Sequence, residues 1–223
     1  MRPKTSRFHP LGFFVIAALF LIGLAALPAL ATAQSGNENA PGQSKPQASL
    51  APDMHPLDVG QPFPDVTLSI PLTAGEAQEL GIDPKAKSVT IGDFKAQGVI
   101  LVVYSMYCPF CQREAPELNA MHKLIADKGL SGKLKLVGLA AGNSPFEVNA
   151  FRETYAITFP LLPDKDFAVH KALGQVGTPF YYVLKRQGKG FTIVLTQLGR
   201  VASPEAFLNE AIAKTGLSEE KTQ

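Results

Sequence analysis

The stretch VILVVYSMYCPFC, residues 99–111, contains the pattern that decides the fold. Its first part, residues 99–104, is apolar and rich in β-branched side chains, which is typical of a strand buried on both faces of a parallel or mixed sheet. Residues 109–127 follow with the spacing of an amphipathic helix. Both cysteines of the chain, Cys108 and Cys111, fall where this strand ends and this helix begins. We therefore expect the chemistry of the protein at a strand-to-helix junction.

Strands and helices alternate along the rest of the chain. The sequence Ser144-Pro145-Phe146-Glu147 combines a capping box with a proline at the first helical position, and so predicts a helix start. The Gly-rich segment 186–190 lies between two apolar runs and predicts a hairpin turn. The remaining predicted strands are 65–70, 134–140, 159–162, 180–185 and 191–198, and the remaining predicted helices are 145–155, 166–173 and 204–214. This order indicates an α/β fold.

The composition fits one globular domain of ordinary size. The chain has 223 residues, of which 46% are apolar and 18% are charged, with a formal net charge of +2. Two cysteines are too few for a disulfide-rich mini-protein, and the modest charge argues against a disordered or nucleic-acid-wrapping chain. We therefore expect no nucleic-acid partner.

The first 33 residues have the three regions of a secretion signal. A basic flank precedes the uncharged apolar run 11–27, and small residues around Ala31 and Ala33 indicate cleavage before Gln34. An uncleaved anchor is the alternative, because the apolar run is close to the lower limit for spanning a bilayer. Either way we expect a periplasmic or otherwise extracytoplasmic protein, which contacts the membrane only if the segment stays uncleaved.

The rest of the chain divides by composition. Residues 34–58 are rich in Gln, Ser, Asn, Pro and Gly without apolar periodicity, and are interpreted as a flexible linker. The folded domain is expected over residues 59–216, with a short tail at 217–223. Within it, residues 71–88 are longer than a simple connection needs, and include a possible short helix at 75–80. We interpret them as a surface insertion, with a partner-binding edge as the alternative.

The Cys108-Pro109-Phe110-Cys111 motif is suited to thiol-disulfide exchange. A spacing of three residues on a first helical turn brings the two sulfurs within bonding reach. The free N–H groups and dipole at a helix N-terminus favour thiolate over thiol. We therefore expect Cys108 to attack a substrate disulfide and the more buried Cys111 to resolve the mixed disulfide. Pro109 removes one N–H donor and Phe110 adds apolar bulk, so both residues are expected to tune the pair.

Other uses of the two thiols find less support. Structural zinc needs four ligands, and no second CxxC or HxxxH motif is present. A purely structural disulfide would close a loop too short to constrain the unfolded chain strongly. Covalent haem attachment would need histidine where Gln112 stands. We therefore expect no metal and no cofactor.

Together these motifs resemble the thioredoxin fold, and more narrowly the exported TlpA/ResA-like branch of thiol-disulfide oxidoreductases. The resemblance covers about residues 59–215 and rests on the CxxC motif, on Pro116 inside the following helix, and on the two segments Val59-Gly60-Gln61-Pro62-Phe63-Pro64-Asp65 and Val176-Gly177-Thr178-Pro179. It implies a central mixed sheet flanked by helices, with an N-terminal extension and a small insertion. The sequence departs from the family pattern at Tyr107, where many members have tryptophan, and at Phe110, where proline is more usual.

The resemblance also implies roles for individual residues. A cis peptide before Pro179 would present the backbone of Thr178 to an extended substrate strand beside Cys108. Tyr107, Pro109 and Phe110 would contribute to the same substrate surface. Glu114 would transfer protons during exchange or raise the thiol pKa values by like-charge repulsion. A solvated helix carboxylate is the alternative for Glu114.

The predicted function is protein-disulfide exchange by an exported enzyme, more specifically a reductase that serves cytochrome c maturation or envelope redox homeostasis. We expect a monomer that acts on disulfide-bearing proteins and is kept reduced by a membrane electron donor. A peroxiredoxin-type peroxidase is one alternative, since Ser105 lies three residues before Cys108, but Leu101 stands where the peroxidase pattern has proline. A non-catalytic module that holds a client or Cu(I) through the same thiolates is the other.

Overall fold

A mixed five-stranded sheet forms the centre of the computed structural model, which describes residues 54–69 and 72–218. Within these residues the strand order is β5-β4-β3-β6-β7. Strands β3, β4 and β5 run parallel, β6 runs antiparallel to β3, and β7 runs antiparallel to β6. The bounds are β3 (Gly98–Tyr104), β4 (Leu134–Ala141), β5 (Leu161–Asp164), β6 (Phe180–Gln187) and β7 (Gly190–Leu198). The predicted α/β fold with a central mixed sheet is confirmed.

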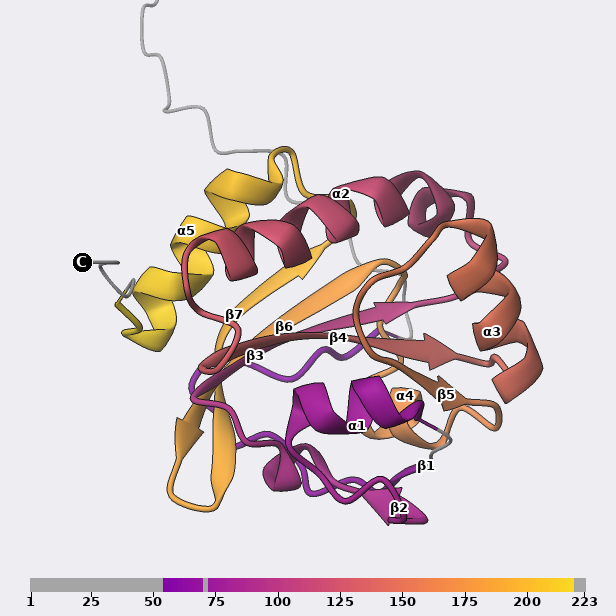
Figure 1. Cartoon of the computed structure of the whole chain (residues 1–223), viewed down its shortest axis with the longest axis horizontal. Helices are drawn as coiled ribbons and strands as arrows, with labels where there is room; N and C mark the ends of the chain where they lie inside the picture. The colour runs from indigo at the N-terminus through magenta and orange to yellow at the C-terminus, as the bar shows by residue number, and fades with distance from the viewer. Residues whose placement is uncertain (1–53, 70–71, 219–223) are drawn as a thin grey trace, which may run out of the picture. The chain divides into compact units, whose positions relative to one another are not determined.

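Helices cover both faces of this sheet. Figure 1 shows α2 and α5 on one face and α1 and α4 on the other, with α3 beside the β4–β5 end. The bounds are α1 (Ala74–Leu80), α2 (Pro109–Asp127), α3 (Pro145–Thr154), α4 (Ala168–Ala172) and α5 (Pro204–Thr215). A hydrophobic core lies on each face of the sheet, and β3 contributes to both cores because its alternate side chains point to opposite faces. Ile100 and Val102 pack into the core with α2 and α5, while Leu101 and Val103 pack into the other.

Element boundaries differ from the sequence prediction where pairing, rather than hydrophobicity, sets them. The predicted strand 159–162 is observed as β5 at Leu161–Asp164, since Leu161 is the first residue in register with β4. The predicted strand 65–70 contributes only β1 (Leu68–Ser69), which pairs with β2 (Ser88–Val89) in a separate two-stranded sheet. A 3-10 helix, η1 (Ile91–Asp93), follows β2.

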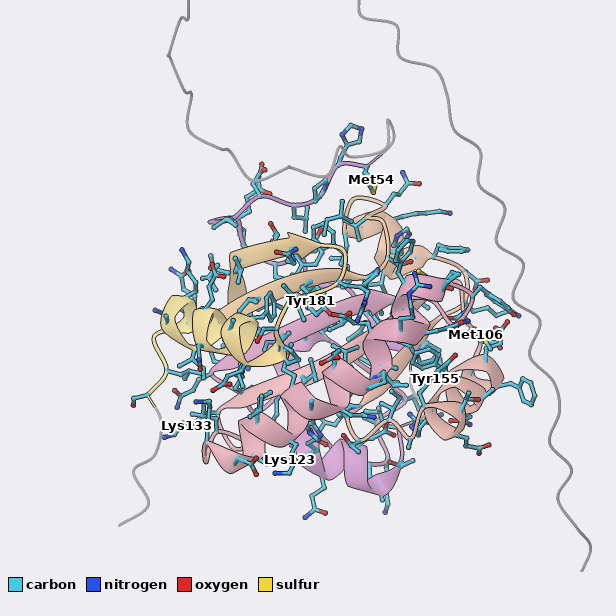
Figure 2. All side chains as sticks on the ribbon, turned by 90° about the horizontal axis from the view of Figure 1, so that it is seen from above. Met54, Met106, Lys123, Lys133, Tyr155 and Tyr181 are labelled. Atoms are coloured by element: carbon cyan, nitrogen blue, oxygen red, sulfur yellow. The ribbon has the colours of Figure 1, made fainter. Side chains whose placement is uncertain are left out.

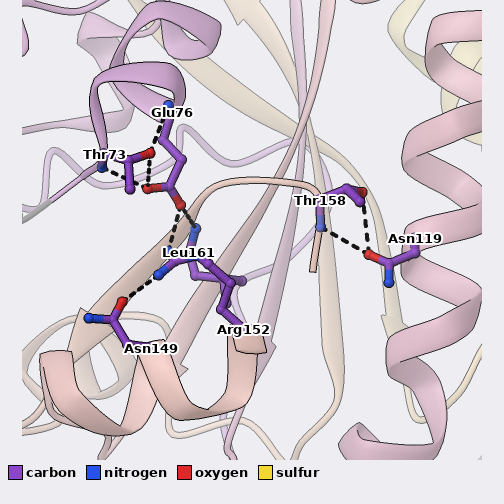
Figure 3. Close-up of polar contacts among 7 residues, drawn as sticks. All are labelled: Thr73, Glu76, Asn119, Asn149, Arg152, Thr158 and Leu161. Carbon is purple, nitrogen blue, oxygen red and sulfur yellow. Dashed lines mark hydrogen bonds and ion pairs between the residues drawn. The ribbon is translucent and has the colours of Figure 1, made fainter. Parts of the chain in front are cut away.

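The segment 71–88 is anchored to the body of the protein by a buried carboxylate. Thr73 caps α1, and the side chain of Glu76 accepts a hydrogen bond from the Thr73 N–H at 2.8 Å. Glu76 also accepts from Arg152 Nη2 at 2.6 Å and from the N–H of Leu161 at 3.2 Å (Figure 3). These bonds connect α1 to α3 and β5. The insertion is therefore anchored to α3 and β5 through Glu76.

The folded part of the chain begins earlier than the composition indicates. Residues 54–58 belong to the predicted linker by composition, and within them His55 and Leu57 form hydrogen bonds to the body of the protein. The composition does not reveal these contacts because they are made mainly by backbone groups, such as the His55 N–H that donates to Gly174 O at 2.8 Å.

The predicted secretion signal and the rest of the predicted linker, residues 1–53, lie outside the described residues. Within 54–69 and 72–218, none of the helices is both long and apolar enough to cross a bilayer.

Candidate functional site

The site lies where the buried strand β3 gives way to helix α2. The turn between them is held by side chains of two other residues: Met106 N–H donates to Asn143 Oδ1 at 2.8 Å, and Met106 O accepts from Gln112 Nε2 at 2.8 Å. Cys108 then occupies the N-cap position of α2, and Pro109 begins the helix. The N–H groups of the first helical turn consequently point toward the Cys108 sulfur.

Cys108 is half-buried, and its thiol donates a hydrogen bond to Thr178 O over 3.3 Å. Burial is the largest single influence and raises the pKa of the Cys108 thiol, but the polar groups near the sulfur outweigh it. These groups are the Thr178 side chain, the backbone N–H groups of Cys111 and Phe110, and the Cys111 thiol. The net pKa of Cys108 is lower than the ordinary cysteine value, as expected for a sulfur at a helix N-terminus.

Cys111 has the opposite environment one turn later. Its side chain is 1% exposed, and burial raises the pKa of the Cys111 thiol to about 12. Both cysteines are free thiols in the structure. The pair therefore consists of an accessible sulfur that ionises readily and a buried sulfur that keeps its proton.

Thr178 and Pro179 approach this pair from the opposite side, at the start of β6. The peptide bond between them is cis, and Pro179 O accepts a hydrogen bond from the Gly199 N–H at 2.8 Å. The two residues are about 70 positions from Cys108 in the sequence, yet the Thr178 carbonyl contacts its sulfur. The sequence-predicted residues Cys108, Thr178 and Pro179 are thus brought together.

Glu114 is fully buried, at 0% exposure, so the alternative of a solvated helix carboxylate is wrong. It accepts hydrogen bonds from Tyr181 Oη at 2.5 Å, from Arg200 Nε at 2.7 Å and from the N–H of Val201 at 2.9 Å. Helical periodicity could have revealed this burial, because Glu114 shares the helix face of Cys111 and the buried Leu118.

Glu114 forms an ion pair with Arg200 and also influences the neighbouring Tyr181 hydroxyl. Burial and then the neighbouring Glu114 carboxylate raise the pKa of Tyr181 far above the ordinary tyrosine value, so the phenol stays protonated and donates. Sequence reasoning missed both Tyr181 and Arg200, since neither is near Glu114 in the chain. Figure 2 shows Tyr181 on β6 beneath α2.

Tyr107, Pro109 and Phe110 surround Cys108 on the surface. Tyr107 is 66% exposed and Phe110 is 56% exposed. The Tyr107 hydroxyl donates to the Glu147 carboxylate on α3, and the Arg113 guanidinium lies 4.8 Å from the centre of the Phe110 ring. Two exposed rings therefore border the accessible sulfur.

Two buried polar atoms beside the site have no hydrogen-bond partner among the described residues: the Tyr104 hydroxyl and Asn143 Nδ2. Both belong to strand ends that carry the site, since Tyr104 ends β3 and Asn143 follows β4. As for metal ligands, the described part of the chain holds no cluster of three or more His, Cys, Asp or Glu side chains.

Comparison with known proteins gives a matched region that includes Cys108, Cys111 and Thr178 and ends before Arg200. A family model described as "AhpC/TSA family" matches residues 59–194. Among curated proteins, the thiol-disulfide oxidoreductase ResA of Bacillus thuringiensis subsp. konkukian is 27% identical over 107 residues. That alignment covers 48% of this chain and 60% of the relative, so the chain spans less than two thirds of the relative's length.

Solved structures with the same fold are more distant in sequence. A candidate thiol:disulfide interchange protein, DsbE, from Chlorobium tepidum is 20% identical with a TM-score of 0.55, covering 72% of this chain and 99% of its own. The thioredoxin domain of a thiol-disulfide oxidoreductase from Bacteroides vulgatus is also 20% identical, with a TM-score of 0.52 and coverage of 69% and 97%. These similarities support a thioredoxin-like fold.

Proposed function

Because the chain belongs to the AhpC/TSA family, we propose that it is a thiol-disulfide oxidoreductase that exchanges disulfides with protein substrates through Cys108 and Cys111. One observation carries the proposal: the two thiols, one helical turn apart, differ in exposure and in the direction of their pKa shifts. An exchange enzyme needs this asymmetry, because one sulfur must attack while the other waits as a thiol.

The reaction follows from that asymmetry. The Cys108 thiolate attacks one sulfur of a substrate disulfide, forms a mixed disulfide and releases the other substrate sulfur as a thiolate. Cys111 then loses its proton and attacks the Cys108 sulfur, which breaks the mixed disulfide. The substrate leaves with two reduced sulfurs, and the protein retains a Cys108–Cys111 disulfide. Two electrons have passed from the protein to the substrate.

The second step needs a proton acceptor, since the pKa of Cys111 is about 12. We assign this proton transfer to Glu114, which lies one turn beyond Cys111 on the same helix and is completely buried. Tyr181 and Arg200 hold its carboxylate in place. Like-charge repulsion has less support as its role, because burial and hydrogen bonding dominate the shifts of both thiols.

Substrate binding is assigned to the surface around Cys108. The Thr178 backbone faces the reactive sulfur and is placed to pair with an extended substrate segment, in the manner of strand addition. Tyr107, Pro109 and Phe110 border the same sulfur and supply apolar contact area. Such a surface recognises a main chain more than a particular sequence.

The cellular setting rests on the sequence of the N-terminal segment. A basic flank and an apolar run within residues 1–33 support export, and an extracytoplasmic reductase needs electrons delivered across the membrane. We accordingly propose a reductase outside the cytoplasm that is monomeric and is recharged by a membrane electron donor. Cytochrome c maturation and general envelope redox homeostasis are the two processes that such an activity would serve.

Two serine variants test the exchange mechanism. Cys108→Ser is expected to abolish reduction of insulin disulfides, whereas Cys111→Ser is expected to form a mixed disulfide that persists and is detected on a non-reducing gel. Cys111→Ser is the matched control for the loss of one thiol. Exchange activity retained by Cys108→Ser would refute the mechanism. Hydrogen peroxide turnover that survives in Cys111→Ser would indicate a peroxidase instead.

The direction of electron flow is tested by the reduction potential of the Cys108–Cys111 couple. A potential near that of thioredoxin, about −270 mV, supports a reductase, and one near about −120 mV supports an oxidant. The measurement uses equilibration with glutathione buffers followed by trapping of free thiols.

A further inference from the structure

Residues Met54–Leu57, here called the N-terminal strap, lie against the loop Leu173–Pro179, here called the Thr178 loop. The His55 N–H donates to Gly174 O at 2.8 Å, and the Gly177 N–H contacts the Met54 sulfur. Figure 2 shows Met54 at the margin of the molecule, where the described chain begins. The strap thus contacts two backbone groups of the Thr178 loop, Gly174 O and the Gly177 N–H.

The contact between strap and loop is close enough to require glycine. At Gly174, where φ is +88°, an added Cβ would lie 1.8 Å from the His55 carbonyl oxygen. At Gly177 an added Cβ would lie 3.2 Å from the Met54 sulfur. A side chain at position 174 would therefore displace the strap, because the atom it meets belongs to the backbone.

The strap is itself fixed to the body at its other end. The Leu57 N–H donates to the Tyr182 hydroxyl at 3.2 Å, and that hydroxyl donates to Leu173 O at 2.7 Å. Farther along, the Gly60 N–H donates to Ile193 O at 2.8 Å on the edge strand β7. The strap therefore continues into a segment that pairs with the sheet, and is not a free end.

The Thr178 loop stands between the strap and the reactive sulfur. Its far side presents the Thr178 carbonyl to the Cys108 thiol at 3.3 Å, and the Thr178 side chain is one of the groups that lower the pKa of Cys108. On its near side, besides the strap, His170 Nε2 contacts Val176 O at 2.8 Å. A displacement of the loop would therefore change the surroundings of the Cys108 sulfur directly.

We propose that the N-terminal strap positions the Thr178 loop, so that Met54 and His55 are positioning residues for exchange at Cys108. This inference rests on the proposed function. It places a determinant of activity before residue 59, outside the part of the chain that matches the family model. A domain cut at the family boundary would lack it.

A pair of glycine variants tests the proposal in the full-length protein. Gly174→Ala introduces a side chain where the strap lies, while Gly188→Ala introduces one in the β6–β7 turn, where φ is also positive (+59°) and nothing lies within 4 Å. Both glycines have a positive φ, with the larger backbone strain expected at Gly174, and only Gly174→Ala also displaces the strap. We expect kcat/KM for insulin reduction to fall at least about fivefold in Gly174→Ala, the equivalent of one lost hydrogen bond, and to stay unchanged in Gly188→Ala.

A second readout separates positioning from a loss of fold. The rate of alkylation by iodoacetamide below pH 9 reports Cys108 alone, because Cys111 still carries its proton there. The midpoint of this pH profile is expected to move upward in Gly174→Ala and in Met54→Ala, and to recover only in part in Met54→Leu, which restores the volume of the side chain but not the sulfur that accepts from Gly177.

The outcomes distinguish the two proposals. If the wild-type protein does not reduce insulin, the proposed function fails. If the wild-type protein is active, and Met54→Ala matches it in both kcat/KM and the alkylation profile, the strap proposal is overturned while the proposed function stands. If Gly174→Ala does not fold, Met54→Ala with its Met54→Leu control still decides.

Discussion

Two buried glutamates of this protein have the same kinds of hydrogen-bond partners, but only one of them lies next to a cysteine. Glu76 on α1 and Glu114 on α2 each accept hydrogen bonds from an arginine and from a backbone N–H of another element. Each carboxylate also accepts from a hydroxyl, and each is one partner of an ion pair, with Arg152 and Arg200 respectively. Glu76 connects the insertion to the sheet (Figure 3), whereas Glu114 lies one turn from Cys111.

The difference teaches that burial and an arginine partner do not by themselves identify a functional acid. A buried charge needs such partners wherever it lies, because leaving it unpaired is costly. What distinguishes Glu114 is its neighbour Cys111, a thiol that loses a proton in the proposed exchange reaction. Glu76 has no such neighbour among the residues that bond to it, and we interpret it as structural.

The largest expected effect comes from removing each carboxylate in turn. Glu76→Ala and Glu114→Ala are both expected to lower the free energy of unfolding by about 1–3 kcal/mol, because each leaves buried hydrogen-bond donors without their acceptor. Only Glu114→Ala should also slow exchange, by about 100-fold, the typical contribution of a general acid–base group. Urea unfolding followed by circular dichroism and insulin reduction by the folded fraction measure the two effects.

The isosteric variants Glu76→Gln and Glu114→Gln serve as controls, since they keep most of the packing. Exchange that is slowed equally by the Glu76 and Glu114 variants would show that the loss follows stability and not proton transfer. Unchanged exchange in Glu114→Gln would remove Glu114 from the mechanism.

A smaller effect is expected on the free energy of unfolding at high pH, where the buried Cys111 thiol next to Glu114 ionises. Because burial raises the pKa of Cys111 to about 12 in the folded protein, the folded state binds more protons than the unfolded state above the ordinary thiol pKa. Stability is therefore fully present below about pH 9 and falls as the pH rises toward 12. Unfolding measured over this range should show a shallower decline in Cys111→Ala, whereas Glu76→Gln should leave the decline as it is. An identical decline in Cys111→Ala would contradict the assignment.

The smallest expected effects come from the hydroxyl that serves each carboxylate. Tyr181→Phe removes one hydrogen bond to Glu114, and Thr73→Ala removes the N-cap that bonds Glu76. Each is expected to cost about 1 kcal/mol of stability. Tyr181→Phe should in addition change the pH dependence of exchange, since its hydroxyl bonds the proposed proton acceptor. A change of the same kind in Thr73→Ala would erase the distinction between the two glutamates.

The sequence predicted those parts of the fold and site that depend on local pattern. The strand at residues 99–104, the helix from Pro109 and the positions of both cysteines follow from hydrophobic spacing and a break at proline, which are properties of neighbouring residues. The partners of Glu114 could not be predicted in this way. Tyr181 and Arg200 lie 67 and 86 positions away in the chain, and only the folded sheet brings them to α2.

The contacts of residues 54–58 were missed for a different reason. They are made largely by backbone N–H groups, which every residue type except proline carries, so no composition reveals them. Gly174 was the available signal: its positive φ and its close approach to His55 require glycine, but a lone glycine after a short helix is equally typical of an ordinary helix end.

The N-cap position of α2 sets a conflict between stability and activity. Cys108 occupies it without forming a side-chain capping bond, whereas serine is among the preferred residues at such a position. The variant Cys108→Ser, expected to lack exchange activity, should therefore be more stable than the wild-type protein by up to about 1 kcal/mol and unfold at a higher temperature. A sequence optimised for stability alone would replace the proposed nucleophile.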